Sequence, residues 1–217
     1  MWLQNFGRAT QTTTDGHLSN NSNPDGLKAD LGVELMVDIA KGDQHAFQLL
    51  VENYQAMVFG LLRRILGPHG AIEDVAQEAF VRVWKNREKY RAQGKFSTFL
   101  YRITYNLALN RIRDEKRKPL PGMPKFDGIE IAQQDLRSDT PEEIASRGDW
   151  AGLISWGLGR LPHNQRAVLV FQHYDGFSME EISSVTGLSS AAVKSMLHRA
   201  RINLREILQP YKDSEND

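Results

Sequence analysis

The chain has 217 residues, of which 41% are hydrophobic and 25% are charged, and its 27 basic side chains balance 27 acidic ones. This composition is typical of a water-soluble globular protein, and no apolar run approaches the roughly 20 residues that span a bilayer. Cysteine is absent, which excludes disulfides and thiolate metal sites; with no recognisable secretion signal at the N-terminus, we expect a cytoplasmic protein.

The zero net charge hides an uneven distribution along the chain. Residues 43–118 carry 14 Lys and Arg against 8 Asp and Glu, residues 119–149 carry 3 against 7, and residues 150–212 carry 7 against 4. Basic blocks that alternate with acidic segments suggest polyanion-binding modules joined by a linker, although chance clustering gives the same pattern.

The apolar pattern predicts an all-α fold of two small helical domains. Residues 1–27 are rich in Thr, Asn, Ser and Gly, and they predict a disordered tail. Apolar residues at helical spacing then predict helices near residues 31–41, 43–66, 71–86 and 97–116. Ser97 is the expected N-cap of the last of these helices.

Residues 119–148 hold four prolines and an acidic excess, and they predict a flexible linker. Near its end, Thr140 and Pro141 could open a short helix. The second domain, residues 149–217 with a short acidic tail, is expected to have helices over residues 150–160, from Pro162 as first helical residue, and from Ser178. Glu181 would complete a capping box with Ser178.

The C-terminal part has the form of a helix-turn-helix, with a short helix, a glycine-containing turn and a longer helix. Along the longer helix, basic side chains share one face and small polar ones lie beside it: Ser190, Lys194, Ser195, His198, Arg199, Arg201 and Arg205. A helix that enters the major groove needs such donors along one face. An ordinary surface helix with solvated charges is the alternative.

Residues 89–118 mix aromatic with basic side chains. Aromatic faces stack on unpaired bases while cations follow the phosphates, so this mixture indicates a site for single-stranded nucleic acid. Phe96 and Phe99 are expected in the core. The expected surface residues are Tyr101, Arg102, Tyr105 and Arg113.

The predicted helix over residues 71–86 carries an acidic and amide face of Asp74, Gln77 and Glu78, opposite its small apolar residues. Two carboxylates one turn apart could serve catalysis or hold a metal, but neither a partner histidine nor a glycine-rich phosphate loop accompanies them. We therefore interpret this face as a docking surface for a basic partner, with a merely solvated face as the alternative.

Four segments together resemble bacterial RNA polymerase sigma factors of the sigma-70 type, in the small extracytoplasmic-function (ECF) subfamily. They are "GDQHAFQLLVENY", "EDVAQEAFVRVW", "FSTFLYRITYNLALNRIR" and "LPHNQRAVLVFQHYDGFSMEEISSVTGLSSAAVKSMLHRARINLRE". The resemblance implies a non-enzymatic subunit without cofactor, metal or small-molecule substrate, which directs promoter-specific transcription initiation, often in a stress or envelope-signal response. Its partners would be promoter DNA, the β′ coiled coil and β flap of core polymerase, and an anti-sigma factor.

The resemblance also implies roles for particular residues. Residues 28–118 would form region 2 and residues 149–217 region 4. The polymerase contact would be made by Asp74, Gln77 and Glu78. The −10 element would be bound by Lys95, Ser97, Thr98, Tyr101, Arg102, Tyr105, Asn106 and Arg113. The −35 element would be bound by Ser190, Lys194, Ser195, His198, Arg199 and Arg201.

Two other classes of function compete with this interpretation. A conventional helix-turn-helix regulator would bind DNA without being a polymerase subunit, but it would need a sensor or receiver domain. An enzyme acting on nucleic acid would need a metal-binding carboxylate cluster, for which Asp74 and Glu78 are the nearest candidates.

Overall fold

The computed structural model describes residues 30–67, 71–117 and 140–212, and every regular element within these ranges is a helix. The expected N-terminal tail, most of the expected linker and the acidic C-terminal tail lie outside the described residues. Among the described helices, none combines the length and the apolarity needed to cross a membrane.

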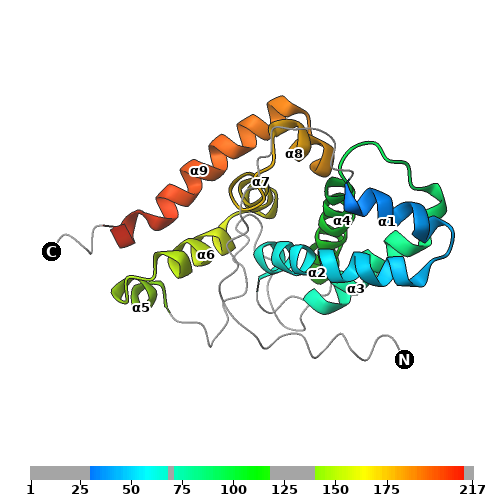
Figure 1. Cartoon of the computed structure of the whole chain (residues 1–217). Helices are drawn as coiled ribbons and strands as arrows, with labels where there is room; N and C mark the ends of the chain where they lie inside the picture. The colour runs from blue at the N-terminus through cyan, green and yellow to red at the C-terminus, as the bar shows by residue number, and fades with distance from the viewer. Residues whose placement is uncertain (1–29, 68–70, 118–139, 213–217) are drawn as a thin grey trace.

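The chain is divided into two groups of helices (Figure 1). The N-terminal group consists of α1 (Leu31–Ala40), α2 (Gln44–Leu66), α3 (Ile72–Lys85), the short 3-10 helix η2 (Arg87–Lys89) and α4 (Phe96–Arg117). The C-terminal group consists of α5 (Pro141–Ser146), α6 (Trp150–Arg160), α7 (His163–His173), α8 (Met179–Thr186) and α9 (Ser190–Lys212).

The start of α4 differs from the expectation. The helix begins at Phe96, so Ser97 lies inside its first turn and the prediction of Ser97 as N-cap is wrong. The carboxylate of Asp30 accepts hydrogen bonds from the Phe96 N–H at 2.7 Å and from the Gly32 N–H at 2.9 Å. A side chain remote in sequence therefore satisfies a free donor at the start of α4, as well as one in α1.

The start of α7 also differs, by one residue. Pro162 has extended backbone and serves as the N-cap, and the helix begins at His163. The prediction of Pro162 as the first helical residue is therefore wrong.

Capping boxes open two helices of the C-terminal group, and the one at Ser178 was expected from the sequence. Ser178 Oγ accepts from the Glu181 N–H at 3.1 Å, and Glu181 Oε2 accepts from the Ser178 N–H at 3.0 Å. Thr140 and Glu143 make the same reciprocal pair at the start of α5. These boxes satisfy free donors at each N-terminus and fix where α5 and α8 begin.

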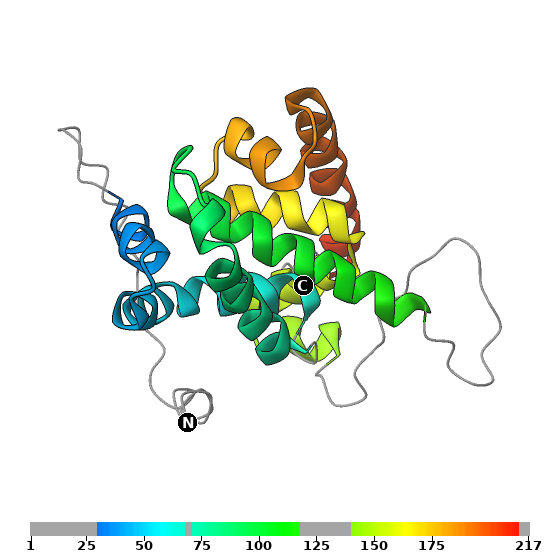
Figure 2. The same cartoon turned by 90° about the vertical axis from the view of Figure 1, so that its right-hand side faces the viewer.

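The two groups of helices share one continuous hydrophobic core. In Figure 2, α4 crosses in front of α7, and α8 lies above it. The ring of Tyr105 on α4 meets that of Phe171 on α7 with 5.4 Å between centroids, and Phe171 is fully buried. The sequence predicts two separate domains joined by a flexible linker. In the structure these two domains pack directly against each other.

Candidate nucleic-acid and polymerase interfaces

Helix α9 presents the predicted DNA-reading residues to solvent. One stripe of the helix is buried through Val193, Leu197 and Ala200, and packs against the other helices of the C-terminal group. All the residues predicted to bind the −35 element are exposed: Ser190, Lys194, Ser195, His198, Arg199 and Arg201. The buried stripe therefore orients a basic face outward, in the geometry that groove binding requires.

The turn between α8 and α9 is fixed by local contacts. Gly187 adopts a left-handed conformation with φ of 74°, which favours glycine. Across the turn, the hydroxyls of Ser183 and Ser190 lie 3.3 Å apart. At the other side of α9, Arg201 Nη2 donates to Gln172 Oε1 on α7 at 2.7 Å.

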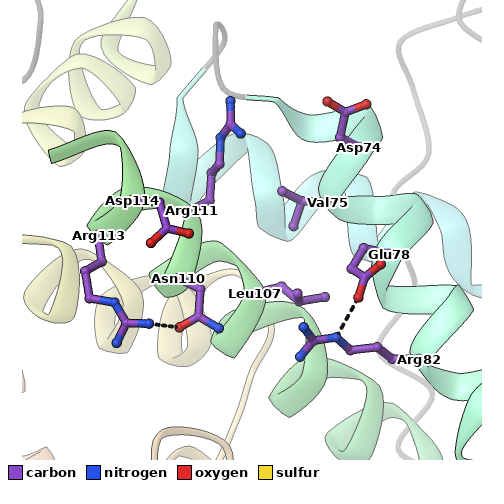
Figure 3. A pocket seen from close by; sticks show the side chains of 9 residues that line it. All are labelled: Asp74, Val75, Glu78, Arg82, Leu107, Asn110, Arg111, Arg113 and Asp114. Atoms are coloured by element: carbon purple, nitrogen blue, oxygen red, sulfur yellow. Dashed lines mark hydrogen bonds and ion pairs between the residues drawn. The ribbon is translucent and has the colours of Figure 1, made fainter. Parts of the chain in front are cut away.

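The acidic face of α3 lies on the surface, as expected. Asp74 is exposed, Gln77 and Glu78 are half-buried, and the neighbouring Val81 is 38% exposed. Glu78 Oε1 accepts from Arg82 Nε at 2.9 Å, so this carboxylate is already paired within the helix. Asp74 points away from that pair (Figure 3).

A shallow hollow of about 350 Å³ separates this face from α4. Asp74, Glu78 and Arg82 line it from α3, and Arg113 lines it from α4, where Arg113 Nη2 donates to Asn110 Oδ1 at 2.8 Å (Figure 3). One of the predicted −10 residues therefore adjoins the predicted polymerase-docking face.

The predicted −10 residues are divided by the fold into an accessible and a covered set. Ser97 and Thr98 are half-buried, and the exposed residues are Lys95, Arg102, Asn106 and Arg113. Tyr101 and Tyr105 are only 6% and 3% exposed. The expectation that both tyrosines lie at the surface is wrong in this arrangement, because α7 and the loop after it cover them.

The tyrosine hydroxyls lie in a poorly hydrated setting. Burial raises the pKa of Tyr105 to about 12. Burial and the nearby charge of Asp175 raise the pKa of Tyr101 further, and its hydroxyl donates to Asp175 Oδ1 at 2.8 Å. Both phenols therefore remain protonated donors at any physiological pH.

Asp175, on the loop after α7, was not identified from the sequence. Burial raises the pKa of its carboxyl, against the opposing effects of the Tyr101 hydrogen bond and of Arg64 Nη1 at 3.5 Å. Its second oxygen, Oδ2, is buried without a hydrogen-bond partner. An aspartate in a short polar turn carries no sequence signal of such burial, because the burial comes from the other domain.

Arg166 was also missed, and it is a buried cation at 4% exposure. Its guanidinium donates to the carbonyls of Leu158 at 2.7 Å and Ile65 at 2.8 Å, and also to the carbonyl of Gly159. These carbonyls belong to the C-terminal turns of α6 and α2, where a helix dipole favours a cation. Burial lowers the Arg166 pKa to about 10, which leaves the side chain charged at neutral pH.

No group of three or more histidine and carboxylate side chains within the described ranges has a metal-binding arrangement. The arrangement offers surfaces for macromolecules, with an acidic face on α3 and a basic face on α9.

Comparison with known proteins identifies the family to which the chain belongs. Residues 50–118 match the sigma-70 region 2 family, and residues 157–204 match the sigma-70 region 4 family. The ECF sigma factor SigW of Bacillus subtilis is 34% identical over 176 residues, which cover 79% of this chain and 93% of SigW. The chain belongs to the ECF sigma factors of the sigma-70 family.

Other relatives agree with this membership. The ECF sigma-E factor of Escherichia coli K12 is 31% identical over 183 residues, covering 81% of this chain and 93% of that protein. The solved structure of CnrH in complex with the cytosolic domain of CnrY is 26% identical, with a TM-score of 0.58 over 83% of this chain and 99% of CnrH.

The sigma factor is therefore a non-enzymatic protein that directs promoter-specific transcription initiation. The two rival interpretations, a regulator outside the polymerase and an enzyme acting on nucleic acid, are excluded by this membership.

Proposed function

We propose that this sigma factor divides its work among three surfaces. The acidic face of α3 docks on the β′ coiled coil of core polymerase, α4 and the loop before it bind the −10 element, and α9 binds the −35 element. Residues 28–118 would act as region 2 and residues 149–217 as region 4, with the β flap as the polymerase contact of region 4.

The exposed basic face of α9 is the observation that carries this proposal. Lys194 and Arg199 are exposed, while Val193 and Leu197 on the opposite stripe are buried, so one rigid helix holds the donors outward. Cations on such a face bind phosphates, and side chains near the helix N-terminus reach base edges.

The charge of α3 supports the docking assignment. Asp74 lies in the first turn of the helix, where the helix dipole favours anions. An exposed acidic N-terminal end therefore does not destabilise α3, and it is available to bind a basic partner. Exposed Val81 adds an apolar surface beside it.

Complexes of similar proteins suggest a further protein partner. CnrH is solved in complex with CnrY, and RpoE of Bartonella quintana with the anti-sigma factor NepR. We propose that an anti-sigma factor restrains this chain too, in the cytoplasm and in response to an envelope or stress signal.

The docking face can be tested by reversing its charge. Asp74→Lys together with Glu78→Lys should weaken binding to purified core polymerase about tenfold or more, because like charges then face the basic partner. The measurement is fluorescence anisotropy of the labelled sigma factor titrated with core polymerase. Glu73→Lys is the matched control, since it reverses an exposed charge in the same helical turn away from the face.

An unchanged affinity in a well-folded double variant would refute the docking assignment. Thermal unfolding of all three proteins separates this outcome from misfolding.

The −35 face can be tested by transcription in vitro. Start-site mapping after overexpression identifies promoters, and run-off transcription with purified core polymerase then measures their use. Arg199→Ala should lower transcription from promoters with an intact −35 element by about tenfold and leave core binding unchanged. Equal transcription by the variant and the parent protein would show that Arg199 does not contribute to −35 binding.

A further inference from the structure

We infer that Asp30 is a positioning residue for −10 recognition, because its side chain joins the start of α1 to the start of α4. The inference rests on the proposed −10 site, and it adds a residue outside the proposed DNA contacts. Its carrying observation is one carboxylate that caps two helices. Asp30 Oδ2 accepts from the Phe96 N–H at 2.7 Å, and Asp30 Oδ1 accepts from the Gly32 N–H at 2.9 Å.

The position before α4, where a helix usually has a capping side chain, is taken by a cation. Lys95 directly precedes Phe96, the first residue of the helix, and a lysine side chain carries only donors. A cation at this end also meets the positive end of the helix dipole. Lys95 is one of the proposed −10 contacts, so a side chain suited to phosphates stands where a capping acceptor would stand. Asp30 supplies the acceptor instead.

The segment before α4, residues 90–95, is the −10 loop of the proposed site. The five residues that follow Tyr90 in this loop are all exposed, so the position of the loop depends on how its two ends are held. At one end, the Tyr90 ring meets Phe99 at 5.0 Å and Phe96 at 6.1 Å between centroids. At the other end, Phe96 is fully buried and its N–H is bound by Asp30. Asp30 therefore fixes the point at which the exposed loop passes into α4.

The carboxylate of Asp30 is itself held by an aromatic neighbour. Tyr54 on α2 lies with its hydroxyl 3.5 Å from Asp30 Oδ1, and its ring meets Phe96 edge-to-face with 4.9 Å between centroids. Burial and the nearby charge of Asp30 raise the pKa of Tyr54 to about 12, so the hydroxyl stays a donor at physiological pH. The half-buried carboxylate therefore has a donor at each oxygen and a defined direction.

The first turn of α4 carries two further proposed contacts, Ser97 and Thr98, next to Lys95. All three residues therefore move with the point at which α4 starts. A binding site needs its groups held within about 0.5 Å, so release of the Phe96 N–H should weaken −10 binding although Asp30 is not itself a contact. The acidic face of α3 and the basic face of α9 do not depend on this bond, so polymerase docking and −35 binding should not change.

The substitution Asp30→Ser separates the two hydrogen bonds of this carboxylate. Serine is a good N-cap and keeps the bond to the Gly32 N–H within α1, but its shorter side chain cannot also reach the Phe96 N–H. Asp43→Ser is the matched control. Asp43 is the N-cap of α2 in the same domain, and its side chain accepts from two N–H groups of its own helix. The two variants therefore make the same exchange at an N-cap, and only Asp30→Ser breaks a link to α4.

Amide hydrogen exchange in the full chain reports the bond directly. The Phe96 N–H should exchange at least about tenfold faster in Asp30→Ser than in the parent chain, because it loses its acceptor. In Asp43→Ser it should exchange at the parent rate. Equal exchange of the Phe96 N–H in Asp30→Ser and the parent would overturn the inference.

Binding of −10 DNA to the holoenzyme, assembled from the full chain and purified core polymerase, reports the function. The probes are the labelled non-template −10 strand of a promoter mapped by transcription and the same strand with its −10 bases substituted. Asp30→Ser should bind the intact strand about tenfold more weakly and discriminate less between the two strands. Asp43→Ser should match the parent, and both variants should keep the parent affinity for core polymerase.

The discrimination between the two strands distinguishes positioning from a merely structural role. A destabilised domain would lower the amount of active holoenzyme and leave the ratio of the two affinities unchanged. An unchanged ratio in Asp30→Ser, or equal losses in Asp30→Ser and Asp43→Ser, would therefore overturn the inference.

Lys95→Ala separates failure of this inference from failure of the −10 assignment. Weaker −10 binding by Lys95→Ala, together with parent-like binding by Asp30→Ser, would overturn the inference and leave the −10 assignment standing. Parent-like binding by both variants would refute the −10 assignment, and the inference with it.

Discussion

Gly32 is the residue where the N-terminal domain has least room. A Cβ at this position would overlap the ring of Phe96, which is itself fully buried at the start of α4. Gly32→Ala should therefore lower the free energy of unfolding by about 1–3 kcal/mol through overpacking, measured by urea denaturation.

Gly60 provides a matched control for this substitution. It is also helical, but the nearest atoms to an added Cβ are 3.6 Å away, at the flexible end of Arg64. Gly60→Ala should raise the free energy of unfolding by about 0.5–1 kcal/mol, because alanine favours the helix. Equal effects at the two positions would contradict the close approach of α1 and Phe96.

Removal of the buried Arg166 side chain should destabilise the fold. Arg166→Met leaves the carbonyls at the ends of α6 and α2 without their donor, so the free energy of unfolding should fall by about 1–3 kcal/mol. Arg160→Met is the control; its guanidinium lies over the Trp156 ring at 4.8 Å, and its loss should cost less than about 1 kcal/mol. Thermal unfolding of both variants gives the comparison, and similar losses would count against a special role for Arg166.

At the scale of the element, the first turn of α8 determines how the helix-turn-helix begins. Ser178→Ala removes the side-chain acceptor of the Glu181 N–H and should cost about 1 kcal/mol of stability. Ser184→Ala in the same helix is the control, because Ser184 is exposed and alanine favours the helix interior. Hydrogen exchange of α8 amides reports both changes, and equal exchange in the two variants would contradict the capping role.

Local sequence patterns predict most helices well. The period of apolar residues gives α2, α3 and α6 within a residue or two, because each helix buries one stripe. The exposed positions of Lys194 on α9 and Asp74 on α3 follow from the same period.

The misses at the start of α4 and at the two tyrosines have one physical origin, which is contact between residues far apart in sequence. Asp30 caps α4 from 66 residues away, so the local preference for serine as a cap gave the wrong start. Tyr101 and Tyr105 lie on a face that a single helical domain would leave open. The burial of that face by Phe171 and Phe177 cannot be predicted from the period of α4.

Two carboxyl groups give the packing of the two domains opposing pH dependences. Burial raises the pKa of Asp175, beside Tyr101 of α4 and Arg64 of α2. Its contribution to this packing is therefore present below its ordinary pKa and is lost as pH rises through the raised value. The pKa of Glu181 is lowered, first by the Ser178 N–H of its own capping box and also by Lys95. Only the effect of Lys95 depends on the packing of the two domains, and this contribution is lost as pH falls.

Asp175→Asn should isolate the second effect. The variant should become less compact as pH falls from about 7 to about 4, the range in which carboxyl groups titrate, whereas the parent chain should resist this opening. The measurement is energy transfer over this range between dyes on two introduced cysteines, Glu52→Cys on α2 and Glu206→Cys on α9, both at exposed positions. Superimposable pH profiles for the two proteins would show that Asp175 does not titrate with the packing of the two domains.

The rings of Tyr101 and Tyr105 meet those of Phe171 and Phe177 between the two domains, and we call this contact the aromatic seam. It has a consequence at high protein concentration. The 22 residues numbered 118–139 join the two halves, and the seam itself involves only α4, α7 and the segment leading into α8. Region 4 of one molecule can therefore occupy region 2 of another with the same contacts, which is domain swapping. Concentrated stocks should accumulate reciprocal dimers that return to monomers only slowly on dilution, since each must first release both seams.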